Sequence, residues 1–226
     1  NTSIGSVSPD LYSFGISKVL VFYSNNKRLA NTLYLDASDV NAASSSSASY
    51  SSLSKKGNAS QYKVGLNEIA NLTADQIKTY LTSSGNDALN SDIKNLANKL
   101  VSGKSTTWEK AEAIFNWVRD NIDYEYYSNT KYKATGTLSK KRANCCDHAN
   151  LVVALCRAAD IPARFSHAKG CTFSSGLVTG HVWAQIYVDG VWYSADATSS
   201  RNSLGNIKNW NVKSFSNLNQ YAHLSF

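Results

Sequence analysis

Residues 181–196 read HVWAQIYVDGVWYSAD and contain a turn signal flanked by strand-forming residues. Asp189-Gly190 is a strong signal for a two-residue β-hairpin turn, because the two central positions of such a turn favour residues that tolerate a positive φ. Strand-like residues precede and follow the turn, over 180–188 and 191–197. The sequence therefore predicts two antiparallel strands joined by a tight turn.

The same turn brings a histidine and a carboxylate together. If the loop holds only two residues, Trp183 faces Asp196 and His181 faces Thr198. His181 and Asp196 are then diagonal neighbours on one face, about 7–8 Å apart at the backbone and closer at their side chains. We therefore expect the Asp196 carboxylate to hydrogen-bond one ring nitrogen of His181 and to leave the other nitrogen free as a base.

A nucleophile for this base is predicted at the start of the preceding helix. Leu151, Leu155 and Ala158 share one face of a helix over residues 145–159, and Cys145 stands at or just inside its N-terminus. Helix amides and the helix dipole stabilise a thiolate there, and the Cys145 amide is available to an oxyanion. Each residue alone also has an ordinary structural interpretation. Together, cysteine, histidine and carboxylate meet the requirements for acyl transfer through a thioester.

Amphipathic helices are predicted ahead of this segment, over about 72–82, 89–101 and 106–122. The last begins with a capping box, in which a Thr hydroxyl and a Glu carboxylate each accept from a free amide. A further strand is predicted at 163–167, after the proline that ends the nucleophile helix. The pattern predicts an α+β fold in which the nucleophile helix packs on an antiparallel sheet.

The N-terminal part differs in composition from the rest. It has two strand-like pieces, at 18–23 and 32–35, followed by an Ala- and Ser-rich run over about 42–57. Such a run is typical of a flexible loop or a boundary. We therefore divide the chain into an N-terminal extension of unknown role, residues 1–70, and a catalytic domain, residues 71–226.

Composition narrows the partners. The formal charge of +7 favours contact with a polyanion, such as an acidic wall polymer, a membrane surface or nucleic acid, but solubility alone explains it better. The lysines are scattered and form no long stripe, so we expect no nucleic acid partner. No apolar run is long enough to cross a bilayer, so we expect no membrane span.

The cysteines resemble no small disulfide framework. Adjacent Cys145 and Cys146 cannot easily serve two bridges, and the absence of a C-x-x-C pair argues against structural zinc. Free thiols indicate a reducing or anaerobic setting. Cys171 is left open, either paired with Cys156 or lining the cleft. The oxygen-rich run around Asp87 lacks the spacing of a calcium loop, so no metal site is predicted.

Several motifs together resemble transglutaminase-like cysteine proteins. Residues 143–149, ANCCDHA, resemble the family's nucleophile motif, usually G-x-C-x-D-x-A, and residues 155–164, LCRAADIPAR, are similar to the segment that follows it. Residues 181–192 resemble the histidine strand and turn. Asp196-Ala197-Thr198 fits the aspartate, which is normally followed by Pro-Thr. The resemblance covers about residues 111–198.

This resemblance implies a papain-like or transglutaminase-like core in which Cys145 is the nucleophile, His181 the base and Asp196 the orienting group. Two departures, alanine for the usual glycine at 143 and for the usual proline at 197, remove no catalytic group. Weaker candidates for the oxyanion site or the substrate wall are Asn144, Cys146 and Trp183.

The run from Cys145 to His148 most resembles the pseudomurein endoisopeptidases of methanogenic archaea and their viruses. That resemblance implies hydrolysis of Ala–ε-Lys isopeptide cross-links at the cell wall, by a secreted surface protein or one that a virus releases during lysis. It implies no required cofactor, with a divalent cation such as calcium as a stabiliser. A monomer is expected. Two alternatives stay open: a transamidase that passes the acyl group to an amine, and a non-catalytic wall-binding or adhesin module.

Overall fold

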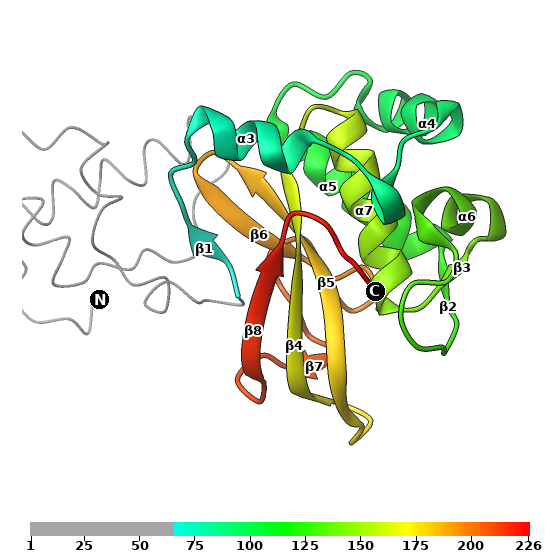
Figure 1. The fold of residues 1–226 in the computed structure, drawn as a ribbon, viewed down its shortest axis with the longest axis vertical. Helices are drawn as coiled ribbons and strands as arrows, with labels where there is room; N and C mark the ends of the chain where they lie inside the picture. The colour runs from blue at the N-terminus through cyan, green and yellow to red at the C-terminus, as the bar shows by residue number, and fades with distance from the viewer. Residues whose placement is uncertain (1–65) are drawn as a thin grey trace, which may run out of the picture. The chain divides into compact units, whose positions relative to one another are not determined.

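The computed structural model describes residues 66–226, in which helices pack on a curled antiparallel sheet (Figure 1). The helices are α3 (Ala74–Leu81), α4 (Ser91–Val101), α5 (Thr107–Asn121), α6 (Lys133–Lys140) and α7 (Cys145–Ala158), with a short 3₁₀ helix, η2 (Gly85–Asp87). The strands are β1 (Glu68–Ile69), β2 (Asp123–Tyr124), β3 (Arg142–Ala143), β4 (Ala163–Phe173), β5 (Val178–Val188), β6 (Val191–Ala195), β7 (Trp210–Asn211) and β8 (Ser216–Tyr221).

The hairpin of β5 and β6 has the predicted register. Val188 pairs with Val191, and the pairing continues to Ala184 and Ala195. Asp189 and Gly190 have φ values of 49° and 84°, the positive values that a two-residue turn of this kind needs. The sheet order is β1-β6-β5-β4-β7, with β8 also paired to β4. The predicted α+β class, with a helix on an antiparallel sheet, is confirmed.

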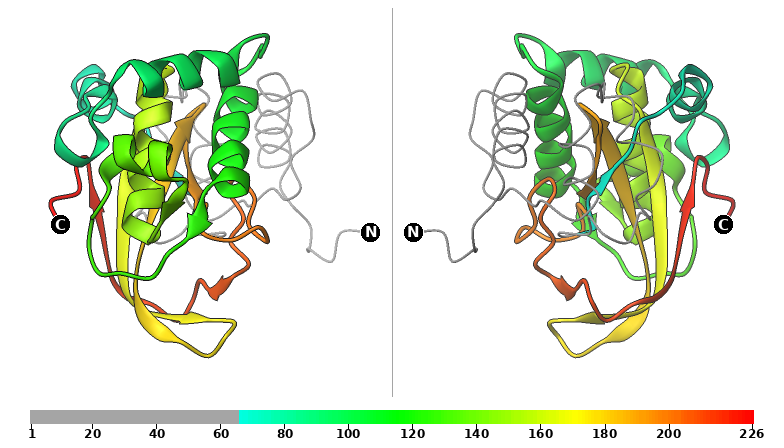
Figure 2. Two further views of the ribbon diagram at one scale, coloured as in Figure 1. Left: turned by 90° about the vertical axis from the view of Figure 1, so that its right-hand side faces the viewer. Right: turned by 90° about the vertical axis from the view of Figure 1, so that its left-hand side faces the viewer.

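Helix α7 lies in the middle of the domain, against α4, α5 and α6 on one side and β4 and β5 on the other (Figure 2). Its residues from Cys146 to Arg157 are all buried. Because side chains alternate along a strand, β5 divides its residues between two faces. Val182, Ala184 and Ile186 join the main core around α7. Trp183 joins a second, smaller core on the opposite face.

The predicted helices agree with the observed ones to within a few residues, and the capping box of α5 is present. The elements that were not predicted include α6, the short elements η2, β2 and β3, and the C-terminal strands β7 and β8. In addition, Leu66 is buried in the second core and β1 pairs with β6, so the end of the segment assigned to the extension takes part in the sheet. The strands predicted at 18–23 and 32–35 lie outside the described residues.

One buried arginine ties four segments together. Arg157, near the end of α7, forms a fully buried ion pair with Asp87 of η2. Its guanidinium also donates to the carbonyl oxygens of Tyr80, Thr82, Ala163 and Ala222. Asp87, which belongs to the oxygen-rich run in the sequence, therefore serves as the counter-ion of Arg157.

The substitution Arg157→Met is expected to lower the free energy of unfolding by about 3–5 kcal/mol, because it leaves the buried Asp87 carboxylate without its cation. The matched control is Arg142→Met, since Arg142 is 62% exposed and lies 3.9 Å from Glu125. That change is expected to cost under about 0.5 kcal/mol. Urea unfolding measures both, and equal costs would contradict the role given to Arg157.

Within residues 66–226, no helix is both long and apolar enough to cross a bilayer. Over the same range, no group of three or more His, Cys, Asp or Glu side chains is arranged to hold a metal ion.

Candidate active site

The candidate nucleophile is the first residue of α7. Asn144 caps the helix, and its side-chain oxygen accepts from the amide of Asp147 at 3.0 Å. Cys145 follows and is only partly buried, so its sulfur lies at a helix N-terminus where it reaches a cavity. That position stabilises a thiolate, because unpaired amides and the positive end of the helix dipole face it.

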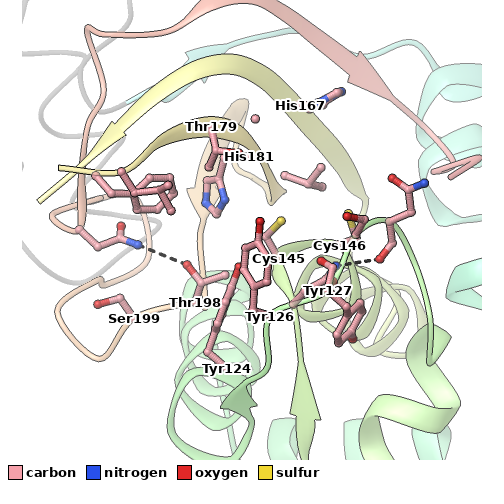
Figure 3. Close-up of a pocket in the computed structure, with 18 of the residues that line it drawn as sticks. Tyr124, Tyr126, Tyr127, Cys145, Cys146, His167, Thr179, His181, Thr198 and Ser199 are labelled. Carbon is pink, nitrogen blue, oxygen red and sulfur yellow. Dashed lines mark hydrogen bonds between the residues drawn. The ribbon is translucent and has the colours of Figure 1, made fainter. Parts of the chain in front are cut away.

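The predicted histidine–carboxylate pair is present. His181 Nε2 lies 2.8 Å from Asp196 Oδ2, and both side chains are almost completely buried. This leaves Nδ1 as the ring nitrogen free to serve the sulfur. The imidazole of His181 hydrogen-bonds Cys145, and Figure 3 shows the two side chains next to each other at the cavity. The structure thus brings Cys145, His181 and Asp196 together from α7, β5 and the end of β6.

The carboxylate of Asp196 accepts four hydrogen bonds. On Oδ1 they come from the hydroxyl of Thr198 at 2.6 Å and from the backbone amide of Thr198 at 3.2 Å. On Oδ2 they come from His181 and from the indole Nε1 of Trp210 at 3.0 Å. Sequence reasoning missed Trp210, because it lies fourteen positions further along the chain and no local pattern links it to Asp196.

These contacts favour the charged forms of the three candidate catalytic side chains. Burial opposes the charge on His181, but the neighbouring Asp196 carboxylate overcomes it and raises the pKa of His181 to about 10. Burial also opposes the charge on Asp196, yet the imidazolium and the Thr198 and Trp210 donors lower its pKa to about 2. Hydrogen bonds from the thiol of Cys146 and from His181 hold the pKa of Cys145 well below its usual range. The favoured state at neutral pH is a thiolate beside an imidazolium.

This ionisation predicts a broad pH profile for reaction at the thiolate. Below the lowered pKa of Cys145 the sulfur becomes protonated, and above about pH 10 His181 loses the proton that a leaving group needs. We therefore expect kcat/KM to stay high through neutral pH and to fall as the pH rises through about 10. Initial rates against pH measure this. An alkaline limb near 6.5, the ordinary pKa of histidine, would contradict the pairing.

The cavity at the sulfur has a volume of about 490 Å³. Exposed tyrosines from the segment after α5, Tyr124 and Tyr126, form one wall, and Leu177 at the tip of the β4–β5 hairpin forms part of another. Arg201, which is exposed, also lines it. Within the described residues, none of the side chains that line the cavity is an aspartate or a glutamate. The site therefore presents aromatic surface and positive charge to a ligand.

The three weaker candidates have different places. Both ends of the Asn144 amide are used, since it also donates to the carbonyl oxygens of Tyr127 and Asn129, so this side chain is not available to an oxyanion. Cys146 lines the cavity only marginally, being 4% exposed and part of the main core. Trp183 does not line the cavity. It stacks on His181 from the second core, with ring centroids 5.9 Å apart.

Asp147 has a role that the sequence analysis did not assign. Its carboxylate accepts from the backbone amides of Lys131, Tyr132 and Lys133 and from the hydroxyl of Tyr127 at 2.6 Å. Those three amides lie at the start of α6, so a residue of α7 caps α6. Tyr127, which also lines the cavity, is thereby held by the nucleophile helix.

The remaining cysteines do not join the site. All four thiols in the described residues are free. Cys156 lies in the main core and Cys171 in the second core, so the pairing left open in the sequence does not occur. Burial raises the pKa of Cys171 to about 12 and also raises that of Cys156. Neither thiol is therefore ionised at neutral pH.

Comparison with known proteins agrees with this geometry. Residues 94–197 match the sequence model of the transglutaminase-like superfamily, and the match contains the cysteine, the histidine and the aspartate. This segment is similar to that superfamily. In this chain, the packing of helix α7 on the sheet that contains β4, β5 and β6 brings the three side chains together.

Two solved structures are similar to this chain. A candidate cysteine protease from Cytophaga hutchinsonii is 26% identical, with a TM-score of 0.50, and the alignment covers 66% of this chain and 54% of that one. The periplasmic domain of TgpA from Pseudomonas aeruginosa is 18% identical, with a TM-score of 0.45, over 57% of this chain and 51% of that one. This chain thus spans about half the length of either protein. No curated protein matches the sequence.

Proposed function

We propose that this protein is a cysteine hydrolase that cleaves an amide or isopeptide bond through a thioester. The observation that carries the proposal is the pairing of Cys145, at the start of α7, with a His181 imidazole that Asp196 holds at 2.8 Å. The match of residues 94–197 to the sequence model of the transglutaminase-like superfamily supports it. So does the candidate cysteine protease of similar fold.

The reaction begins with attack of the Cys145 thiolate on the carbonyl carbon of the substrate. The carbonyl oxygen becomes an oxyanion, which the amide of Cys145 at the helix N-terminus is placed to receive. His181 then gives its Nδ1 proton to the leaving amine, so the C–N bond breaks and a thioester forms. A water molecule next gives a proton to His181 and attacks the thioester. The carboxylic acid leaves, and the thiolate–imidazolium pair is restored.

We further propose that the substrate is the Ala–ε-Lys isopeptide cross-link of pseudomurein, which the enzyme meets at the cell wall. The support is the sequence resemblance around Cys145 to His148, together with the formal charge of +7. A cavity with no acidic lining also favours an anionic wall peptide over a cationic one. No cofactor takes part in the steps above.

The test is mass spectrometry of purified pseudomurein fragments before and after treatment. Hydrolysis predicts a free alanine carboxylate and a free lysine ε-amine, with gain of one water. An excess of a small amine separates hydrolysis from transamidation, because a transamidase would attach that amine to the alanine. If the pseudomurein fragments stay intact while other isopeptides are hydrolysed, the proposed wall substrate is wrong. The proposal of a cysteine hydrolase would not be affected by that result.

A further inference from the structure

Two tryptophans pack against His181 but differ in what their N–H groups contact. Trp183 stacks on the imidazole at 5.9 Å, and Trp210 meets it edge to face at 5.7 Å. Both are nearly fully buried. Trp210 Nε1 donates to Asp196 Oδ2, whereas Trp183 Nε1 has no hydrogen-bond partner among the described residues. The site therefore contains a matched pair of indoles, of which one touches the carboxylate.

The chain returns to Asp196 by an organised loop. Asn202 donates from its side-chain nitrogen to the carbonyl oxygen of Asp196 and to the side-chain oxygen of Asn209, both at 2.9 Å. Its side-chain oxygen accepts from the backbone amide of Lys208 at 2.8 Å. Trp210 follows at once and pairs with Phe173 of β4. The position of the indole is thus fixed by the backbone pairing of Trp210 with Phe173 and by the hydrogen bonds that Asn202 makes within the loop.

We propose that Trp210 is a positioning residue, which acts through Asp196 to set the orientation and proton affinity of His181. This inference rests on the proposed function. It adds a residue outside the 94–197 segment that matches the superfamily.

The physical reason lies in the shared oxygen. Asp196 Oδ2 accepts from both His181 and Trp210, so the indole N–H withdraws part of the negative charge that would otherwise act on the imidazolium. The same bond stops the carboxylate from rotating away. A weaker hold on the proton makes His181 a better acid toward the leaving amine, while the ion pair still keeps Cys145 ionised.

The test compares Trp210→Phe with Trp183→Phe, because both changes remove an indole N–H beside His181. Loss of packing is common to the two variants. In Trp210→Phe we expect kcat to fall about tenfold with little change in KM, since one hydrogen bond to a charged group is lost. We also expect the alkaline limb of the pH profile to move to higher pH, because Asp196 then acts on the imidazolium with its full charge. In Trp183→Phe the limb is expected to stay in place.

A readout that needs no substrate keeps the inference separate from the proposed function. The rate of alkylation of Cys145 by iodoacetamide, followed by mass spectrometry across the pH range, reports the thiolate–imidazolium pair directly. An unchanged alkylation profile in Trp210→Phe, or an equal shift in Trp183→Phe, overturns the role of Trp210 whether or not isopeptides are cleaved. If the alkylation profile of Trp210→Phe is shifted but the unaltered protein cleaves no isopeptide, the proposed function is wrong and the positioning role of Trp210 stands.

A second variant guards against misfolding. In 3-benzothienylalanine a sulfur atom replaces the indole N–H, and both rings are kept. Placing this residue at position 210 therefore removes the donor with little change in packing. It is expected to reproduce the pH shift of Trp210→Phe with a melting temperature near that of the unaltered protein. A profile like that of the unaltered protein would show that Trp210 acts by packing alone, and the inference would then be wrong.

Discussion

Replacing Cys145 by alanine is expected to lower isopeptide hydrolysis by about 10⁴-fold or more, because the other thiol at the cavity, Cys146, is buried and its pKa is raised by the hydrogen bond to Cys145 and by burial. The cavity walls and the helix amides remain, so substrate binding should change little. Initial rates on a synthetic Ala–ε-Lys isopeptide measure the loss, and thermal unfolding checks that the fold is intact. Retention of full wall-directed activity would instead indicate a binding module in which the thiol has no part.

The neighbouring thiol supplies the matched control. Cys146 is 4% exposed and belongs to the main core, and it meets the reaction only through a hydrogen bond to Cys145. The substitution Cys146→Ala is therefore expected to keep the rate within about tenfold of the original, at a modest cost in stability. An equal loss in both variants, with folding intact, would show that the nucleophile was assigned one position too early.

Asp196→Asn is expected to lower the rate by about 10³–10⁴-fold at neutral pH. Two N–H groups point at Oδ2, so asparagine must place its carbonyl oxygen there and its NH₂ group toward Thr198, whose hydroxyl is free to turn and accept. The hydrogen bonds from His181 and Trp210 survive this change, whereas the bond from the Thr198 backbone amide and the negative charge are both lost. Without that charge the pKa of His181 falls from about 10, and the thiolate–imidazolium pair reverts to a neutral thiol and imidazole.

The pH profile distinguishes the loss of the Asp196 charge from a general loss of structure. The alkaline limb of any residual activity in Asp196→Asn should lie well below that of the unaltered enzyme. Asp189→Asn, the same chemical change in the turn of the same hairpin, is the control. Asp189 has a φ of 49°, which asparagine tolerates well, so the rate should stay within about twofold. A similar loss at both positions would mean that the hairpin, and not the charge, matters.

Features set by local rules were predictable from the sequence. The Asp189-Gly190 turn fixed the register of β5 and β6, and the register fixed the contact between His181 and Asp196. The position of Cys145 was predictable because a few residues are enough to indicate where a helix begins. Its catalytic role, like that of the other two residues, stays a prediction until the variants are measured.

Features set by distant contacts were not predictable. Helix α6 contains Gly136 and begins at Lys133, and the side chain of its N-cap residue, Tyr132, makes no capping hydrogen bond, so its sequence carries no start signal. Its first amides are satisfied by Asp147, which lies fourteen residues or more further along. Trp210 was missed for the same reason. Only the folded chain brings these donors and acceptors together.

The cap that Asp147 provides has a consequence for engineering. A loop grafted in place of residues 127–133, to accept a different cross-link, would have to present its backbone amides to a carboxylate two positions after the nucleophile. A graft that misses them would leave an uncompensated buried anion at the front of α7, a fault costing several kcal/mol. The path of residues 127–133 and the stability of the front of α7 therefore depend on each other, and libraries should vary side chains on that loop while keeping its path.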